Sequence, residues 1–368
     1  MPPVSTIQVL ISPLDWGLGH ATRCIPIIKR LSTHGLTVIL AGSGPQLTLL
    51  RNEFPALEMV EIPGYGIRYS SEKGGLVRGL IFQIPRILRQ IRRENAWLKN
   101  YCRNRKIDAI ISDNRYGFYH KEIFSVFITH QLFIQTGMGN RVNRILMRLN
   151  YFFIQRFSEC WVPDFQDTSS LAGLLSHPPH LPGIAVKYIG ILSRFHPDRK
   201  EVSNPLLILI SGPEPQRTEL ENKIFEGLSI YKGRAVVVRG LPGMKEKKTI
   251  SNAGIVIYNH LPSEALNEWM NCSAIVISRS GYSSIMDLAR LRRKALLIPT
   301  PGQPEQEYLA KELEEKKWAL QVSQESFRLE ESVKTLQESA VGFPAFSDEK
   351  SADPVLIAFL SRFNGFHP

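Results

Sequence analysis

The chain has 368 residues, 43% of them hydrophobic and 21% charged, which is typical of a globular protein with room for two domains. Its four cysteines lie far apart and show no Cys-x-x-Cys spacing, so neither a disulfide framework nor a structural zinc site is expected. No apolar run approaches the roughly 20 residues that cross a bilayer, and the first residues lack the pattern of a secretory signal. We therefore expect a cytoplasmic protein.

The net charge of +11 lies entirely in the first half of the chain. Residues 1–195 contain 23 Lys and Arg against 12 Asp and Glu, whereas residues 196–368 contain 22 of each. A basic surface attracts anionic partners. The asymmetry predicts that a membrane, a nucleic acid or a phosphorylated substrate contacts the first half only.

The first half opens with a strand, a glycine-containing turn and a helix. An apolar strand is predicted at Ile7–Ile11 and a helix at Ala21–Thr33, where apolar side chains recur at helical spacing. The turn between them contains Gly17-x-Gly19, and the next strand is Val38–Ala41. This βαβ unit is not a dinucleotide fingerprint, because a third glycine and an acid after the second strand are missing. The glycine pair alone also fits an ordinary tight turn.

Polar side chains follow three strands of this half. His20 stands at the start of the first helix, where the helix dipole lowers the pKa of an imidazole and favours its basic form. If the sheet is parallel, the ends of strands predicted at 107–113 and 124–129 share one crevice with His20. The candidates on the acceptor side of this crevice are Asp15, Asp113, Asn114 and His130. Each could equally cap the helix or turn that follows it.

Two segments of the first half predict basic amphipathic helices. Residues 76–104, in one or two pieces because Pro85 lies inside, carry many basic side chains against the single acid Glu94. Residues 140–157 carry four arginines and no acid. Such helices can lie on an anionic membrane surface, or they can pack one face on a core and leave the arginines in solvent. Both interpretations stay open.

A polar linker with two prolines separates the halves. It is predicted at 196–205, which gives domains at 1–195 and 206–368. The second domain is expected to include a last helix at Ala352–Phe363. Strands and helices alternate again after the linker, so a second doubly wound sheet is predicted.

The loops of the second half lie at strand ends and are rich in Gly, Ser and Pro. The first follows the strand Leu206–Ile210 and contains Gly212, and Arg217 comes early in the next helix. Free amides at that helix start are suited to hold a phosphate. The segments Ser278–Asp287 and Leu296–Gln306 repeat the pattern of strand, polar loop and helix. Open α/β sheets bind ligands at such loops.

These last segments resemble family 28 of the GT-B glycosyltransferases, which includes the peptidoglycan lipid-linked N-acetylglucosaminyltransferase. The resemblance is strongest from His260 to Gln306. The turn Trp16–Arg23 is also similar, and it is most like that of related bacterial glycosyltransferases. The resemblance implies an α/β fold of two doubly wound Rossmann-like domains that face each other across a cleft.

The resemblance also implies a role for individual residues. Asp287, six residues after Gly281, takes the place of the acid that binds the ribose of UDP, although the family usually has Glu there. Gln306 matches the glutamine that binds the hydroxyls of the donor sugar, and His20 matches the histidine that acts as a base or as a charge stabiliser. The implied donor-binding set is Gly17, Gly19, Gly212, Arg217, His260, Leu261, Ser280, Gly281, Tyr282, Ser283, Asp287, Gln303, Glu305 and Gln306.

The implied reaction is an inverting transfer of a sugar, an N-acetylhexosamine by analogy with the family, from a UDP-sugar to a membrane-associated lipid or glycan. No cofactor or metal is expected, because the sequence lacks the Asp-x-Asp string of metal-dependent transferases. A peripheral position on the inner face of the cytoplasmic membrane would suit the basic first half.

Two alternatives remain. A UDP-sugar 2-epimerase of the same fold would need no acceptor. A nucleotide- or RNA-binding protein would use the basic face, but RNA binders usually place aromatic residues among the basic ones. Because the arginines here lie on apolar helices, no nucleic acid partner is expected.

Overall fold

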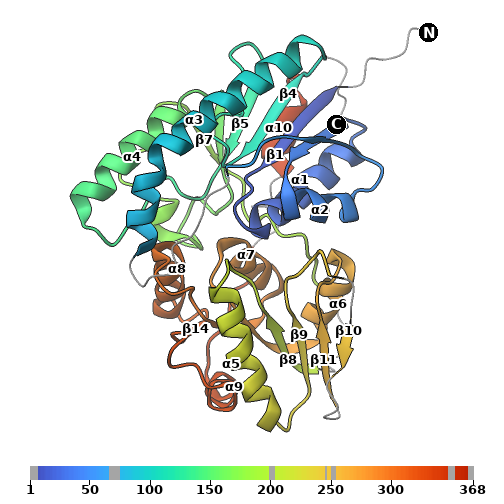
Figure 1. Cartoon of the computed structure of the whole chain (residues 1–368), viewed down its shortest axis with the longest axis vertical. Coiled ribbons are helices and arrows are strands. Elements are labelled where there is room, and N and C mark those ends of the chain that lie inside the picture. Colours follow the sequence, from blue (N-terminus) through green and yellow to red (C-terminus); the bar gives the residue numbers. More distant parts are fainter. Residues whose placement is uncertain are drawn as a thin grey trace. The chain divides into compact units, whose positions relative to one another are not determined.

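The computed structural model describes residues 7–65, 75–198, 204–244, 247–249, 254–346 and 353–363, and it divides into two compact units (Figure 1). The first unit extends to Leu192 and includes the carboxyl-terminal helix. The second contains the residues from Ser193 to Ala345, and the first residues of α3 (Gly75–Arg103), up to Leu80, are grouped with it. The boundary lies close to the one predicted after residue 195. Residues 199–203 of the predicted linker lie outside the described ranges.

The first unit contains a seven-stranded parallel sheet in the order β3-β2-β1-β4-β5-β6-β7. Its strands are β1 (Gln8–Pro13), β2 (Thr37–Gly42), β3 (Glu58–Glu61), β4 (Ala109–Asp113), β5 (Phe124–Ile128), β6 (Glu159–Val162) and β7 (Ala185–Tyr188). The chain begins at β1, moves outward to β3, and then returns to β4 on the other side of β1. The order therefore reverses between β1 and β4, which makes this the topological switch point of the sheet.

Helices connect the strands of the first unit. They are α1 (Leu18–Thr33), α2 (Gly44–Glu53), α3 (Gly75–Arg103), α4 (Asn140–Ile154) and the short 3₁₀ helix η1 (Gly173–Leu175). The long basic segment forms one helix, because α3 continues through Pro85 without a break. None of the helices in the described part of the chain is both long and apolar enough to cross a membrane.

The central strands of the first unit are buried on both faces. The consecutive residues Val9, Leu10 and Ile11 are each 0% exposed. Since successive strand residues point to opposite faces, helices or loops must cover both sides of the sheet. This explains why the strand sequences are uninterrupted apolar runs rather than alternating ones, and why they could be predicted.

The second unit contains another seven-stranded sheet, in the order β10-β11-β9-β8-β12-β13-β14. The strands are β8 (Asn204–Leu209), β9 (Ala235–Val238), β10 (Lys247–Thr249), β11 (Ile255–Tyr258), β12 (Ser273–Ser278), β13 (Lys294–Leu297) and β14 (Leu320–Gln321). All neighbours are parallel except β10, which runs antiparallel to β11 at one edge. The order reverses between β8 and β12, so the switch point lies there.

Five helices belong to the second unit in the described ranges: α5 (Gln216–Ile230), α6 (Ser263–Cys272), α7 (Tyr282–Leu291), α8 (Pro304–Glu315) and α9 (Leu329–Glu338). Side chains of α5 and α9 join those of the central strands in one apolar core. The doubly wound arrangement predicted for this half is therefore present.

The last helix, α10 (Asp353–Leu360), belongs to the first unit and not to the second domain as predicted. The red α10 lies among the blue and green elements of the first unit in Figure 1. Phe359 is fully buried, with its ring 5.5 Å from that of Trp161 and 6.0 Å from that of Phe124. Arg362, just after the helix, places Nη2 2.7 Å from Glu159 Oε1. These contacts attach the end of the chain to β5 and β6.

Candidate active site

The predicted site residues of the first unit gather at its topological switch point. The carboxyl ends of β1 and β4 are neighbours in the sheet, with Pro13 paired to Asp113. His20 comes from the loop and helix that follow β1, and Asp113 is the last residue of β4. Open α/β sheets bind ligands at this position, because the connections on either side leave in opposite directions.

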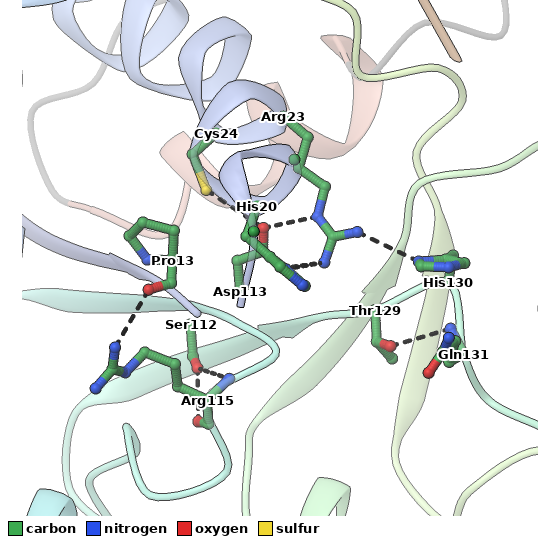
Figure 2. A network of polar contacts seen from close by, with 12 residues as sticks. Pro13, His20, Arg23, Cys24, Ser112, Asp113, Arg115, Thr129, His130 and Gln131 are labelled. Atoms are coloured by element: carbon green, nitrogen blue, oxygen red, sulfur yellow. Dashed lines mark hydrogen bonds and ion pairs between the residues drawn. The ribbon is translucent and has the colours of Figure 1, made fainter. Parts of the chain in front are cut away.

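The turn before α1 sets the position of His20. Gly17 is the N-cap of α1 and has a φ of 78°, a conformation that favours glycine. His20 is the third residue of the helix and is therefore in its first turn. Figure 2 shows its ring beside Asp113, with Arg23 reaching both residues.

A buried ion-pair network fixes His20 and Asp113. The carboxylate of Asp113 is 0% exposed and receives hydrogen bonds from Nε of Arg23 at 2.6 Å and from its Nη2. His20 Nδ1 lies 3.2 Å from Asp113 Oδ1 and 2.8 Å from Arg23 Nη2. Burial raises the pKa of Asp113, but Arg23 and His20 outweigh it and lower the pKa to about 2. Asp113 is therefore ionised at any working pH.

His20 is held in its neutral form. Burial lowers the pKa of His20, the Arg23 guanidinium lowers it further, and Asp113 offsets part of the shift. The sequence indicated a lowered pKa from the helix dipole, whereas the structure adds burial and Arg23 as causes. A neutral imidazole can accept a proton at neutral pH.

Arg23 connects this pair to a second histidine. Its Nη1 lies 3.2 Å from Nδ1 of His130, which follows β5 and is 4% exposed. His20, Asp113 and His130, predicted from three separate strand ends, are thus brought together around one guanidinium (Figure 2). No role was predicted for Arg23. The available signal was its position three residues after His20, which places both side chains on one face of the helix.

The other two acceptor-side candidates have structural partners. Asp15 Oδ2 accepts a hydrogen bond from the backbone N–H of Tyr65 at 2.8 Å, which ties two loops together. Asn114 has a φ of 60° and turns the chain at the end of β4, with its N–H donating to Ile128. Their assignment to an acceptor site stays a prediction.

In the second unit, three predicted donor residues meet where β12 and β13 end. Ser280 Oγ donates to the backbone carbonyl of Gln306 at 2.8 Å. Oε1 of the Gln306 side chain accepts a hydrogen bond from the backbone N–H of Thr300 at 2.9 Å. Its Nε2 lies 4.0 Å from the position that a Cβ atom on Gly281 would occupy. The turn before α7 and the start of α8 are therefore in contact, and the missing side chain of Gly281 leaves room beside Gln306.

Arg279 holds the strand-end loops of this unit in place, although no role was predicted for it. It is 1% exposed, and its Nη1 donates to the carbonyls of Ile298 and Pro299. Nη2 donates to the carbonyl of Gln216 at 2.8 Å and to Gln324 Oε1 at 2.6 Å. Burial lowers the pKa of Arg279 to about 10, so it stays charged at neutral pH.

Two buried polar atoms at the same edge have no hydrogen-bond partner among the described residues. They are Oγ1 of Thr300 and Oε1 of Gln303. Thr300 Oγ1 lies 3.6 Å from the point where a Cβ on Gly212 would stand, and Gly212 itself has a φ of 118°. Buried polar groups are normally paired. Unpaired ones beside a glycine loop mark a place where a polar ligand would complete the hydrogen bonding.

Asp287 lies on α7 and is 9% exposed. Burial raises its pKa to about 6, although Arg194 and a hydrogen bond from Ser193 act in the opposite direction. Ser193 Oγ donates to Asp287 Oδ1 at 2.6 Å. Asp287 is thus a largely buried carboxyl group that accepts hydrogen bonds from the Ser193 hydroxyl and from the backbone of Arg194, the residues at which this part of the second unit begins. No hydrogen bond joins it to Gln306 in the described part of the chain.

Among the remaining donor candidates, Arg217 has carboxylate partners within its own helix and loop. Arg217 is engaged by Glu214 at 2.6 Å and by Glu221 at 3.3 Å, so carboxylates already neutralise it. Leu261 and Tyr282 are buried. The roles predicted for His260, Leu261, Tyr282, Ser283 and Glu305 stay predictions.

Among the described residues, no group of three or more His, Cys, Asp or Glu side chains could hold a metal ion. The buried Cys24 sits beside Asp113, with Sγ 3.6 Å from Oδ2, and burial raises its pKa well above the ordinary value. It is therefore a thiol and not a thiolate ligand.

Comparison with known proteins bears on both units. Residues 245–352 match the model of the glycosyltransferase family 28 C-terminal domain. A search of the curated proteins gave no match. The chain is similar to the spinosyn rhamnosyltransferase SpnG complexed with thymidine diphosphate, with 14% identity, 95% of each chain covered and a TM-score of 0.60. It is also similar to the glycosyltransferase SnogD from Streptomyces nogalater, with 14% identity, 96% of this chain and 100% of that chain covered and a TM-score of 0.59.

A third solved structure is similar over almost the whole chain. MurG from Acinetobacter baumannii is 13% identical, with 97% of this chain and 100% of that chain covered and a TM-score of 0.52. These structures show that the chain has the α/β fold of GT-B glycosyltransferases, as predicted. The family match confirms the resemblance to family 28 over the stretch that carried it in the sequence. Fold and family match together support a glycosyltransferase enzyme.

Proposed function

We propose that the chain transfers a sugar from a UDP-sugar to an acceptor hydroxyl, with inversion at the anomeric carbon. The observation that carries this proposal is the buried pairing of His20 with Asp113 at the switch point of the first unit, at 3.2 Å between Nδ1 and Oδ1. In the proposed state the imidazole proton is on Nδ1 and is donated to Asp113, so Nε2 has a free lone pair. Arg23 Nη2, which lies 2.8 Å from Nδ1, then donates to Asp113 Oδ1 and not to the imidazole. His20 then takes the proton of the acceptor hydroxyl as it attacks, and Asp113 stabilises the imidazolium.

Arg23 supports this role by fixing the carboxylate. It binds both oxygens of Asp113 and leaves Oδ1 within reach of His20. Its positive charge also lowers the pKa of His20, which keeps the base neutral before the reaction. A base with a pKa somewhat below the working pH is available in its deprotonated form without being too weak to accept a proton.

The donor is assigned to the second unit. The unpaired Oγ1 of Thr300 lies next to Gly212, 3.6 Å from the position of a Cβ there. The N-cap of α7 is Gly281, and no side chain caps this helix. Helix amides that lack a cap are suited to hold the oxygens of a diphosphate. In the proposed reaction these amides stabilise the charge of the departing UDP, so the mechanism needs no metal ion. Asp287 is the proposed ribose ligand, Gln306 the proposed sugar ligand and an N-acetylhexosamine the proposed sugar, by the resemblance to family 28, whose C-terminal domain matches residues 245–352.

The acceptor is proposed to be a lipid or glycan at an anionic membrane surface. On α4, the side chains of Ile145, Leu149 and Phe152 are 63%, 39% and 58% exposed, and together they form one stripe at helical spacing. Arg141 and Arg148 on the same helix are exposed too. An exposed apolar stripe flanked by arginines favours a helix that lies in a membrane surface over one with a merely solvated basic face.

The experiment that tests the proposal is a screen of nucleotide sugars by thermal shift, followed by product analysis. A UDP-sugar at 100 times its dissociation constant is expected to stabilise the protein by roughly 2.7 kcal/mol. The protein is then incubated with that donor and with membrane extracts, and transfer is read by the appearance of UDP and a glycosylated lipid. A C2 epimer formed without an acceptor would instead identify an epimerase, and no stabilisation by any nucleotide sugar would contradict the proposal.

A further inference from the structure

The carboxyl group of Asp287 already accepts hydrogen bonds from its own unit. Ser193 Oγ donates to Asp287 Oδ1 at 2.6 Å, and the backbone of Arg194 donates to the same carboxyl group. A separation of 2.6 Å is typical of a hydroxyl bonded to a charged oxygen, which is among the stronger hydrogen bonds. A ligand of Asp287 therefore meets a carboxyl group that is already partly engaged.

The hydroxyl group of Ser193 is fixed from two sides. Its Oγ accepts a hydrogen bond from the backbone N–H of Phe195 at 3.1 Å while it donates to Asp287. A serine hydroxyl has a single proton to donate, and an ionised carboxylate can only accept one. While this pair lasts, the proton of Ser193 is therefore committed to Asp287 and is not offered to a ligand.

Two asparagines of α6 hold the segment that carries Ser193. Asn267 and Asn271 are 6% and 1% exposed and lie four residues apart, on one face of the helix. Asn267 Oδ1 accepts the N–H of His196 at 3.2 Å, and Asn271 Oδ1 accepts the N–H of Asp198 at 3.0 Å. Asn271 Nδ2 also donates to the carbonyl of His196 at 3.1 Å. Because these bonds involve only the protein, a nucleotide that binds Asp287 leaves Ser193 in place.

Little of Asp287 remains open to a ligand. The residue is 9% exposed, and its neighbours Met286 and Leu288 are 0% and 1% exposed. Asp287 is also the only acidic residue of α7. Two adjacent hydroxyls of one ribose would be bound most strongly by both oxygens of a carboxylate at once. Since Ser193 holds Oδ1, Oδ2 is the oxygen left for the nucleotide.

We propose that Ser193 restricts Asp287 to one hydroxyl of the donor's ribose, so that the affinity does not depend on the other hydroxyl. The inference rests on the proposed function, in which Asp287 binds the ribose, and adds how strictly this site selects the pentose of the nucleotide. Ser193 acts through Asp287 and is therefore a positioning residue. The nucleotides that the site accepts then extend from ribonucleoside diphosphates to those that lack one ribose hydroxyl.

The test compares the binding of UDP, 2′-deoxyuridine diphosphate and 3′-deoxyuridine diphosphate to the full chain by titration calorimetry. It is done at pH 8.5, because Asp287 has a pKa of about 6 and is then ionised even when the hydrogen bond from Ser193 is lost. For the wild type, one analogue should bind within about threefold of UDP and the other about 10- to 100-fold more weakly, as expected for the loss of one hydrogen bond to a charged group. If both analogues bind at least about tenfold more weakly than UDP, the site requires both hydroxyls and the proposal is wrong.

Variants of Ser193 separate positioning from a merely structural role. Ser193→Ala frees Oδ1, so the analogue that the wild type tolerates should now bind about tenfold more weakly than UDP. Ser193→Thr keeps the hydroxyl and should keep the wild-type ratio of affinities. A structural role alone would change the affinities for all three nucleotides by the same factor, and an unchanged ratio in Ser193→Ala would overturn the proposal.

The matched control is Ser170→Ala in the first unit. The Ser170 hydroxyl also donates to a buried carboxylate, that of Asp164, at 2.8 Å. Its removal should leave the ratios among the three nucleotides at their wild-type values. The wild-type comparison alone decides the proposal if Ser193→Ala does not fold.

The failure of this inference is distinguishable from that of the proposed function. If both analogues bind as tightly as UDP, Asp287 does not bind the ribose and the inference is wrong, while the role of His20 is untouched. If both bind weakly but UDP binds well, only the inference fails. If the wild type binds neither UDP nor any UDP-sugar, the proposed function itself fails. Tolerance of the 2′-deoxy analogue would support the inference and place 2′-deoxynucleotide sugars among the donors.

Discussion

The two strand-end sites of this protein differ in how completely their polar groups are satisfied. In the first unit, Asp113 and Arg23 are 0% and 2% exposed and bind one another and His20. In the second unit, Thr300 Oγ1 and Gln303 Oε1 are buried without a partner among the described residues. The network of His20, Arg23 and Asp113 is thus closed, although Asp15 Oδ1 in the loop after β1 has no hydrogen-bond partner among the described residues, and the second site has two such atoms.

This difference is consistent with a catalytic base in the first unit and a nucleotide site in the second. A base must keep one geometry and one protonation state, which a closed ion-pair network provides at the cost of a rigid site. A nucleotide must enter and leave, so its site has to leave polar groups that only the ligand satisfies. Substitutions in the first site should therefore affect stability strongly, and those in the second should affect ligand affinity more than stability.

The largest stability effect is expected for Asp113→Ala. The substitution leaves Arg23 buried without its partner, which typically costs about 3–5 kcal/mol. Because the folded pKa of Asp113, about 2, lies below its unfolded value, the stabilisation is complete above pH 4 and disappears as the pH falls through 2. Denaturant unfolding of the first unit, followed by hydrogen exchange of its peptides, measures the loss.

The double variant Arg23→Met/Asp113→Ala is the control for this prediction. It removes both charges, so most of the lost stability should return. A loss below about 1 kcal/mol for Asp113→Ala alone would contradict the closed network.

A smaller effect of opposite sign is expected for Asp287→Asn. The folded pKa of Asp287, about 6, lies above its ordinary value of 3.8, so the wild type loses stability as the pH rises from 4 through 6. Two pKa units correspond to about 3 kcal/mol. The variant should lack this loss, so its stability should fall less than that of the wild type between pH 4 and pH 7.5. Thermal unfolding of both proteins at both pH values measures the difference.

Asp287→Asn should also weaken UDP binding, because the ionised carboxylate is the proposed acceptor for the ribose hydroxyls. For the wild type, UDP affinity should fall as the pH drops below 6, where Asp287 becomes protonated. Titration calorimetry at pH 5 and pH 7.5 measures both effects. Equal UDP affinity of variant and wild type at pH 7.5 would remove Asp287 from the donor site.

The smallest effect is expected for Thr300→Val. The hydroxyl has no protein partner among the described residues, so replacing it with a methyl group should leave stability unchanged or slightly higher. Donor affinity should fall about 3- to 10-fold, since one hydrogen bond contributes about 0.5–1.5 kcal/mol. A loss of stability with unchanged affinity would show that the second site is as closed as the first.

Much of the fold could be predicted because its signal is local. Buried parallel strands are continuous apolar runs, and those at Leu206–Ile210 and Val38–Ala41 were found within two residues of their ends. The helix α2 was missed, since it opens with Gly44-Pro45, which is typical of a turn. The prediction that α10 belongs to the second domain was wrong. An apolar helix sequence indicates that the helix is buried but does not indicate which sheet it packs on.

The site could be predicted in part. His20 and Asp113 are 93 residues apart, and only the expectation of a parallel sheet placed both at one edge. The hydrogen bond between Ser193 and Asp287 spans 94 residues and has no local signal. Arg279 lay inside a predicted ligand loop, but its role depends on backbone carbonyls after β13 and at the start of α5 that only the fold brings together.

The central claim is that His20 is the base of a sugar transfer, and the most direct test is the turnover of His20→Gln. General base catalysis contributes about 10²- to 10⁴-fold, so turnover should fall by that factor while UDP affinity stays within about twofold of the wild type. Because the pKa of His20 is lowered from the ordinary 6.5, the wild-type rate should hold at pH 6.5 and fall only at a more acidic pH, and the variant should lack this decline. Turnover within twofold of the wild type, or an unchanged pH profile, would contradict the account.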